Sequence, residues 1–229
     1  MTTELKETGY GERPPIRSLG YAVGDPFALP GVIQLREEYV TAMRWHPDCE
    51  EGADRYDQSI NTIHIAKTSE TNPEYVEAAM RLTPVANLET SLSFEMISHD
   101  DELSRQVLSH EDREKLNTAG ENGRLWDLTR LVATLDTGVP SSQKVTAILE
   151  MIGAGIVLTC PKLEEDAETQ WIFATNRAMK RVFDMVGIQY SVLASGTMAG
   201  DRSPTYFCKA KPQEAFDFAM NHREQYGPT

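Results

Sequence analysis

Apolar and polar positions follow two periods along the chain, one typical of helices and one typical of strands. Apolar residues recur at helical spacing over 32–45, 140–158 and 176–187. Alternating or continuous apolar runs, which are typical of strands, cover 59–67, 74–85, 125–135, 169–175, 188–196 and 204–212. The order of these elements predicts an α/β fold with a mixed central sheet and helices on both faces.

The two ends of the chain and one central segment do not fit this regular pattern. Residues 1–30 are rich in Gly and Pro, which predicts an extended N-terminal arm before a single domain over 31–229. The highly charged stretch 95–124 reads as an insertion that contains a surface helix. A short helix is expected at Gln213–Arg223.

Composition excludes several classes of protein. The chain has 229 residues, of which 40% are hydrophobic and 25% charged, as expected for a soluble globular protein. A net charge of −13 argues against a nucleic-acid binder, because phosphates require clustered Lys and Arg. No apolar run approaches the roughly 20 residues of a membrane span, and the N-terminus does not resemble a signal peptide. We therefore expect a cytoplasmic protein that does not enter the membrane.

Motifs for metals, nucleotides and nucleophilic serines are also missing. The three cysteines have no CxxC spacing, and the five histidines are scattered, so we expect neither a disulfide framework nor a metal site. The sequence contains no GxGxxG, GxxxxGK[ST] or GxSxG motif. We therefore expect a reducing compartment and no bound metal.

Five charged residues interrupt the apolar pattern, namely Asp54, Asp57, Arg81, Asp127 and Arg130. Residues three apart on a strand point to opposite faces, so the acid and the arginine of the 125–135 strand each need a separate partner. Taken singly, each charge is also typical of a solvated turn or of a surface salt bridge. Taken together, acids and guanidinium groups could satisfy one another and bind a zwitterionic ligand.

Four short motifs follow a helix that carries Tyr39 and Trp45. They are "DRYD" at 54–57, "MRLTPV" at 80–85, "LWDLTRL" at 125–131 and "NRAMKRVFDMVGIQY" at 176–190. In this order and at this spacing, across about residues 32–210, the chain resembles the acyl-homoserine-lactone synthases. The resemblance implies the fold of the general N-acetyltransferase (GNAT) superfamily, a three-layer sandwich.

Two positions depart from the family pattern. The family usually has Glu where this chain has Asp127, whose side chain is one methylene shorter. When Tyr39 and Trp45 are aligned, the arginine of the family's first helix falls at Leu35, and Arg36 is the next residue. One residue corresponds to about 100° around a helix, so either the helix start shifts or the contact of this arginine is lost.

The resemblance implies an acyltransferase that makes a quorum-sensing signal, or autoinducer. An acyl group passes from an acyl carrier protein or from acyl-CoA to the amine of S-adenosylmethionine. The methionine carboxylate then closes the lactone and releases methylthioadenosine. S-adenosylmethionine is a substrate in this scheme, and no cofactor is expected. The sequence leaves the choice of acyl donor open.

The resemblance also implies a role for each charged residue. Asp54 and Asp57 would bind the sulfonium and ammonium groups, and Arg130 would bind the carboxylate. Arg81 would organise the acids, and Asp127 would be the general base. A backbone N–H between splayed strands would stabilise the oxyanion.

Other residues would surround the substrates. Tyr39, Trp45 and Arg36 would contact S-adenosylmethionine, and Trp45 is also typical of a core or rim residue. The acyl pocket would be lined by Phe173 and Thr175, which are equally plausible as ordinary core residues. The basic residues that would dock the carrier, or else form a solvated helix face, are Arg177, Lys180 and Arg181.

Two other functions remain open. One is an N-acyl amino acid synthase, which acylates an ordinary amino acid and forms no lactone. The other is a non-catalytic member that binds an acyl or adenosyl ligand, for which Asp127 and Arg36 are the main support.

Overall fold

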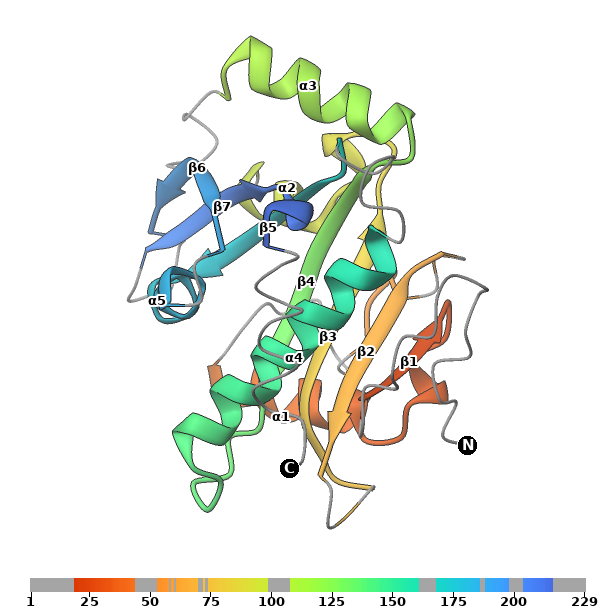
Figure 1. Cartoon of the computed structure of the whole chain (residues 1–229), viewed down its shortest axis with the longest axis vertical. Helices are drawn as coiled ribbons and strands as arrows, with labels where there is room; N and C mark the ends of the chain where they lie inside the picture. The colour runs from red at the N-terminus through yellow and green to blue at the C-terminus, as the bar shows by residue number, and fades with distance from the viewer. Residues whose placement is uncertain are drawn as a thin grey trace. The chain divides into compact units, whose positions relative to one another are not determined.

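The computed structural model describes residues 19–43, 53–57, 59, 61–69, 72, 74–98, 108–160, 168–185, 188–197 and 204–215 (Figure 1). The strands are β1 (Leu19–Val23), β2 (Ile63–Thr68), β3 (Val76–Pro84), β4 (Leu125–Ala133), β5 (Gln170–Asn176), β6 (Tyr190–Gly196) and β7 (Thr205–Ala210). The α-helices are α1 (Val32–Met43), α2 (Leu92–Ser98), α3 (His110–Glu121), α4 (Ser141–Thr159) and α5 (Arg177–Met185). Three short 3₁₀ turns are η1 (Pro26–Ala28), η2 (Leu88–Thr90) and η3 (Pro212–Ala215).

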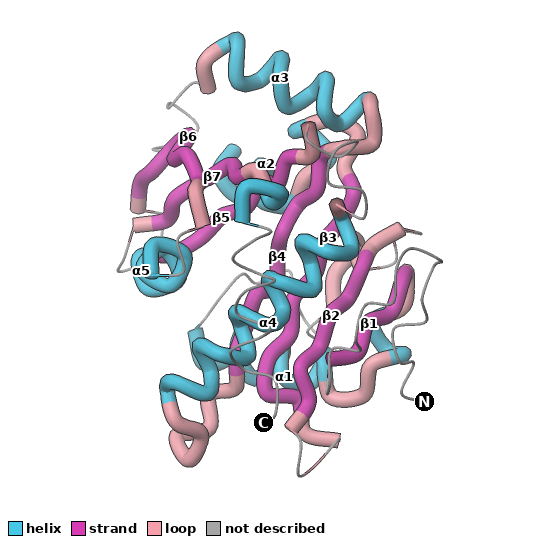
Figure 2. Tube along the Cα trace, viewed as in Figure 1, coloured by secondary structure: helices cyan, strands magenta, loops and turns pink. Residues whose placement is uncertain are grey.

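The strands form a seven-stranded sheet with the order β1-β2-β3-β4-β5-β7-β6 (Figure 2). The sheet is mixed, because β4 and β5 are parallel while β1–β2, β5–β7 and β7–β6 are antiparallel. Residues 76–83 of β3 are all buried, which explains why this strand reads as a nearly continuous apolar run. The α/β class predicted from the order of elements is confirmed.

The chain divides into two compact units, and both β3 and β4 contribute residues to each of them. The first unit comprises residues 1–81 and 130–155, and the second comprises 82–129 and 156–229. The core of the first unit packs α1 against β2, β3 and β4. Its buried apolar side chains are Val32, Leu35, Ala66, Val76, Ala79 and Val132.

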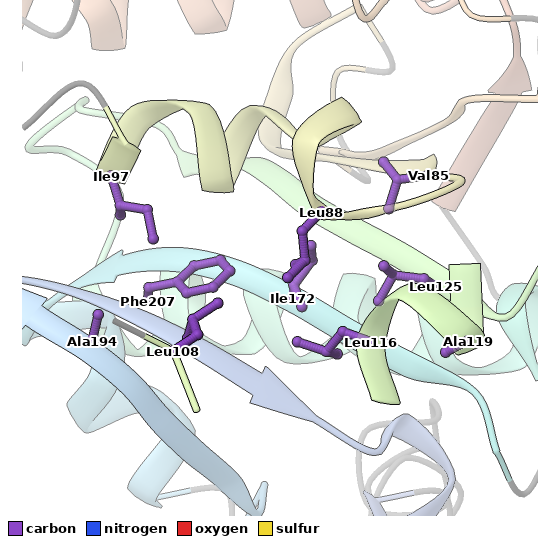
Figure 3. Packing of buried hydrophobic residues seen from close by; sticks show 10 residues of the cluster. All are labelled: Val85, Leu88, Ile97, Leu108, Leu116, Ala119, Leu125, Ile172, Ala194 and Phe207. Carbon is purple, nitrogen blue, oxygen red and sulfur yellow. The ribbon is translucent and has the colours of Figure 1, made fainter. Parts of the chain in front are cut away.

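The core of the second unit lies between α2, α3 and the strands β4, β5, β6 and β7. Figure 3 shows its ten buried members, which are Val85, Leu88, Ile97, Leu108, Leu116, Ala119, Leu125, Ile172, Ala194 and Phe207. Ser109 begins α3 as its N-cap, with its side chain accepting a hydrogen bond from the backbone N–H of Asp112. Near the end of α3, a Cβ placed on Gly120 would lie only 2.2 Å from the carbonyl oxygen of Ala86, so the helix needs glycine there.

Most predicted elements are present, and the main additions are β1 and α2. The predicted arm contains a strand, β1, which pairs with β2 in the register Leu19 to Lys67. Of the helix expected at Gln213–Arg223, the structure describes only the 3₁₀ turn η3, and residues 216–229 lie outside the described part of the chain. The boundary predicted at residue 30 and the single domain after it stay predictions. Within the described residues, no helix is long and apolar enough to cross a membrane.

Candidate functional site

Five charged side chains meet in the first unit. We call Arg36, Asp54, Asp57, Arg81 and Arg130 the ionic cluster. They come from α1, from the turn before β2, from β3 and from β4. Sequence analysis selected all five, and the structure brings them together.

Asp57 lies at the centre of the ionic cluster. Its Oδ1 accepts hydrogen bonds from Nη1 of Arg36 at 2.8 Å and from Nη1 of Arg81 at 2.9 Å. Its Oδ2 accepts the backbone N–H of Asp54 at 2.7 Å. Since both carboxylate oxygens are engaged and the side chain is only 1% exposed, Asp57 is a structural anchor of the cluster.

Asp54 links Arg81 to Arg130. Its Oδ1 accepts a hydrogen bond from Arg81 Nη1 at 2.5 Å, and its Oδ2 accepts bonds from Arg130 Nη2 at 2.6 Å and Nε at 3.2 Å. The same Oδ1 also accepts the backbone N–H of Tyr56, which closes the turn locally. Asp54 and Arg130 are the most accessible members of these pairs, with side-chain exposures of 10% and 8%.

Mutual pairing keeps the buried acids ionised. Burial alone would raise the pKa of Asp54, but the guanidinium groups of Arg81 and Arg130 outweigh it and lower that pKa to about 2. The pKa of Asp57 is lowered for the same reason, by Arg81 and Arg36 against the effect of burial. Burial lowers the pKa of Arg36 to about 10, which still leaves the guanidinium charged at neutral pH.

One member of this region was missed by sequence analysis. His64 on β2 is fully buried, with Nδ1 3.2 Å from Arg36 Nη2 and Nε2 3.2 Å from the carbonyl oxygen of Asp57. Burial, together with Arg36, lowers the pKa of His64 to about 4, so the ring is neutral at neutral pH. The only signal in the sequence is a histidine inside a run that predicts a buried strand, which by itself does not indicate a site.

The backbone of β4 is distorted at Arg130. Arg130 has φ +54°, the only positive φ among the non-glycine residues that the structure describes. The alternation of buried and exposed positions along β4 also changes phase after Asp127. A local change of backbone direction re-aims a side chain, and here the Arg130 side chain reaches Asp54.

The structure answers the question of register on the first helix. Leu35 is buried in the apolar core, whereas Arg36 is 1% exposed and bonds to Asp57. Arg36, one residue after the position at which the family alignment places the arginine, is therefore the residue of the first helix that joins the ionic cluster. Tyr39, one turn later, is half-buried against the same core, and burial raises its pKa. Trp45 lies outside the described residues.

Asp127 belongs to the second unit and has partners of its own. It accepts hydrogen bonds from the hydroxyls of Ser91 and Ser93 at 3.0 and 2.5 Å, and from the backbone N–H of Ser93 at 3.0 Å. Ser91 also caps α2 through the N–H of Phe94. Asp127 and Arg130 thus have separate partners, as strand alternation predicts. Asp127 is 1% exposed and holds the start of α2 against β4.

The strands β4 and β5 separate beyond this point. Their parallel pairing covers only Leu125–Asp127 with Gln170–Ile172, although β5 continues to Asn176. The backbone N–H of Ala174 bonds to Ser93 Oγ at 3.2 Å. The β-ladder is therefore open where an acyl group was predicted to bind.

Phe173 and Thr175 lie on this open part of β5. Phe173 is 2% exposed and packs against the rings of Phe183 and Tyr190, with centroids 5.0 and 6.2 Å away. Thr175 is also buried, and its hydroxyl has no hydrogen-bond partner among the described residues. The acyl-lining role of these two residues stays a prediction.

The three basic residues of α5 are not equivalent. Arg177 and Arg181 are exposed, whereas Lys180 is half-buried. Lys180 bonds to Asp184 at 3.4 Å and lies over the rings of Tyr190 and Tyr206. Arg177 and Arg181 are therefore the accessible part of the predicted docking surface.

Comparison with known proteins gives structural neighbours only. The sequence matches no protein-family model and none of the curated proteins. TofI, solved with an inhibitor and MTA, superposes with a TM-score of 0.57 at 14% identity, covering 87% of this chain and 96% of TofI. BjaI, a CoA-dependent acyl-homoserine lactone synthase solved with MTA, gives 0.58 at 12% identity, covering 90% of this chain and 89% of BjaI.

The AHL synthase LasI gives a TM-score of 0.54 at 15% identity and covers 85% of this chain and 90% of LasI. At 12–15% identity, a shared fold does not establish a shared reaction. These matches cover 85–90% of this chain, so the likeness concerns the order of elements along most of it. The chain shares the α/β fold of TofI, BjaI and LasI.

Proposed function

We propose that this protein is an acyl-homoserine-lactone synthase that acylates S-adenosylmethionine. The observation that carries the proposal is the ionic cluster, in which three guanidinium groups and two carboxylates from four separate segments meet with little exposure. Charges are buried in this way only when they pair closely, and guanidinium and carboxylate groups are also the groups that bind the two ends of a zwitterionic amino acid.

The contacts divide the cluster into supporting and ligand-binding parts. Arg36 and Arg81 both donate to Asp57, and all three side chains are at most 1% exposed, so they support the site. Arg130 and Asp54 are more accessible. We assign the carboxylate of the substrate to Arg130 and its ammonium or sulfonium group to Asp54.

The acyl group is assigned to the second unit, where the ladder between β4 and β5 is open. Phe173 and Thr175 are proposed to line the acyl chain, with Arg177 and Arg181 facing the carrier or coenzyme. Asp127 stays a predicted general base. Its three hydrogen bonds to Ser91 and Ser93 also support a positioning role, in which it fixes α2.

The proposed reaction has two steps. In the first, the substrate amine attacks the thioester carbonyl carbon, the carbon–sulfur bond breaks, the amine loses a proton and the thiol leaves. In the second, a carboxylate oxygen attacks the γ-carbon of the methionine moiety, which is bonded to the sulfonium sulfur. The bond from this carbon to sulfur breaks, so the lactone forms and methylthioadenosine leaves with the electron pair.

A second candidate is an N-acyl amino acid synthase. It is favoured by the fact that both carboxylates of the cluster already bind guanidinium groups. An ordinary amino acid carries no sulfonium and requires no further anion.

One experiment separates these functions. The purified protein is incubated with labelled S-adenosylmethionine and a mixture of acyl-CoA and acyl carrier thioesters, and the products are measured by mass spectrometry. Methylthioadenosine together with a lactone supports the synthase. Acylated amino acids without methylthioadenosine support the second candidate. Binding without turnover supports a non-catalytic member, and Arg130→Ala serves as the inactive control.

A further inference from the structure

We propose that His64 is a positioning residue, which holds Arg36 and the 54–57 turn in place while adding no charge to the ionic cluster. The inference rests on the proposed function, because the cluster is taken as the binding site for S-adenosylmethionine. His64 itself does not touch the substrate in this proposal. It acts through Arg36 and Asp57.

Three elements converge on the imidazole ring. Arg36 of α1 lies 3.2 Å from Nδ1, the carbonyl of Asp57 lies 3.2 Å from Nε2, and the ring itself projects from β2. A guanidinium group can only donate hydrogen bonds, so Nδ1 must be the acceptor. A carbonyl can only accept, so Nε2 must carry the proton. The two contacts together require one neutral tautomer.

Arg36 depends strongly on this contact. Its Nη1 bonds to Asp57, and its Nη2 bonds to His64. Its Nε is buried and has no hydrogen-bond partner among the described residues. Removing the imidazole would leave a second donor of the same buried guanidinium without a described partner. We expect Arg36 to turn away from Asp57 in that case.

Histidine suits this position because of the charges around it. Arg36, Asp57 and Arg81 are the charged groups that act on the ring, two of them positive. An acid at position 64 would add a third carboxylate beside Arg36 and Asp57. An apolar residue there would make neither the hydrogen bond to Arg36 nor the one to the carbonyl of Asp57. A neutral imidazole supplies one acceptor and one donor on opposite sides of a rigid ring.

Three variants separate the two contacts. His64→Asn places an amide oxygen near the position of Nδ1 and keeps an acceptor for Arg36. His64→Gln places an amide N–H near the position of Nε2 and keeps a donor for the turn. His64→Leu removes both. The readouts are the Kd for S-adenosylmethionine by calorimetry and the midpoint of urea unfolding.

We expect His64→Leu to weaken S-adenosylmethionine binding roughly tenfold or more, the loss typical of a hydrogen bond to a charged group. We expect His64→Asn to stay within about threefold of the wild type and His64→Gln to lie between the two. Wild-type affinity in His64→Leu would overturn the inference. So would equal loss in all three variants, because that result indicates a packing role only.

The ring state is tested separately by nitrogen NMR on the wild-type protein. The inference requires the Nε2–H tautomer to persist from pH 8 down to pH 5. A ring that gains a proton near its ordinary pKa, or that carries its proton on Nδ1, would contradict it. If the wild type fails to bind S-adenosylmethionine, the proposed function is wrong. The claim on Arg36 is then decided by NMR of its guanidinium, which must be rigid in wild type and His64→Asn and mobile in His64→Leu.

Discussion

Replacing Asp57 with asparagine tests how the ionic cluster holds together. Asp57→Asn keeps the shape of the side chain and removes its charge. The amide oxygen can still face Arg36 and Arg81, which donate to Oδ1 at 2.8 and 2.9 Å. The amide nitrogen then faces the backbone N–H of Asp54, which donates to Oδ2 at 2.7 Å in the wild type. Two donors meet there, so that hydrogen bond is lost.

The magnitude follows from these three contacts. A hydrogen bond to a charged group contributes roughly 1.5–3 kcal/mol and a neutral one about 0.5–1.5 kcal/mol, so each arginine contact loses about 1 kcal/mol. The orphaned N–H of Asp54 adds about 1–3 kcal/mol. We therefore expect Asp57→Asn to lower the free energy of unfolding by roughly 3–5 kcal/mol, the range for breaking a buried ion pair.

Urea unfolding followed by circular dichroism measures this loss. The matched control is Glu111→Gln, which removes the same charge from an exposed pair with Lys115 and is expected to leave the unfolding midpoint unchanged. A loss below about 1 kcal/mol in Asp57→Asn would mean that the charge of Asp57 is not needed by its two arginines. That result would refute the reasoning.

Four further predictions follow from the same geometry. Because Arg130 has φ +54°, Arg130→Gly is expected to have a free energy of unfolding in urea about 1 kcal/mol higher than that of Arg130→Ala, while calorimetry is expected to find that both variants bind S-adenosylmethionine roughly tenfold or more weakly than the wild type. Gly120→Ala is expected to cost about 1–3 kcal/mol of unfolding free energy, because its Cβ would lie 2.2 Å from a backbone carbonyl oxygen. Asp127→Glu is expected to lower the Tm, because a longer side chain crowds the buried contacts at the start of α2. An unchanged Tm with a full acyl-transfer rate would instead favour the general-base role of Asp127. The native pKa of His64 is about 4, below its ordinary value of 6.5, so between pH 7 and pH 4 the native state binds fewer protons than the unfolded state, and about 3 kcal/mol of stability is lost as the pH falls through this range. The native pKa of Asp54, about 2, extends the loss of stability below pH 4. Urea midpoints of His64→Asn should lack the loss between pH 7 and pH 4.

Much of the ionic cluster was predictable from the sequence, because four of its five charges break the local apolar pattern. Asp54 and Asp57 precede a strand, Arg81 lies inside a buried one, and Arg130 shares a strand with Asp127. A buried charge requires a partner, so an expectation of convergence needs no coordinates. The contacts that join them depend on tertiary structure and were not readable from spacing.

The remaining features had weak or misleading local signals. Arg36 lay one position from the expected arginine, and only the contact with Asp57 shows which residue turns inward. His64 carries no pattern, since a single histidine in a strand is compatible with an ordinary core position. The strand β1 was hidden by Gly and Pro in the N-terminal stretch. The positive φ at Arg130 is not signalled by a glycine or another turn residue at that position.

The most direct test of the account compares two ligands that differ by one group. Calorimetry measures the Kd of the wild-type protein for S-adenosylmethionine and for decarboxylated S-adenosylmethionine, which keeps the sulfonium and the amine. The account predicts that losing the carboxylate weakens binding roughly tenfold or more, as for a charge-assisted contact to Arg130, and that Arg130→Ala binds both ligands equally weakly. Equal affinity of the wild type for the two ligands would contradict the assignment of the ionic cluster as the binding site for the amino-acid end of the substrate.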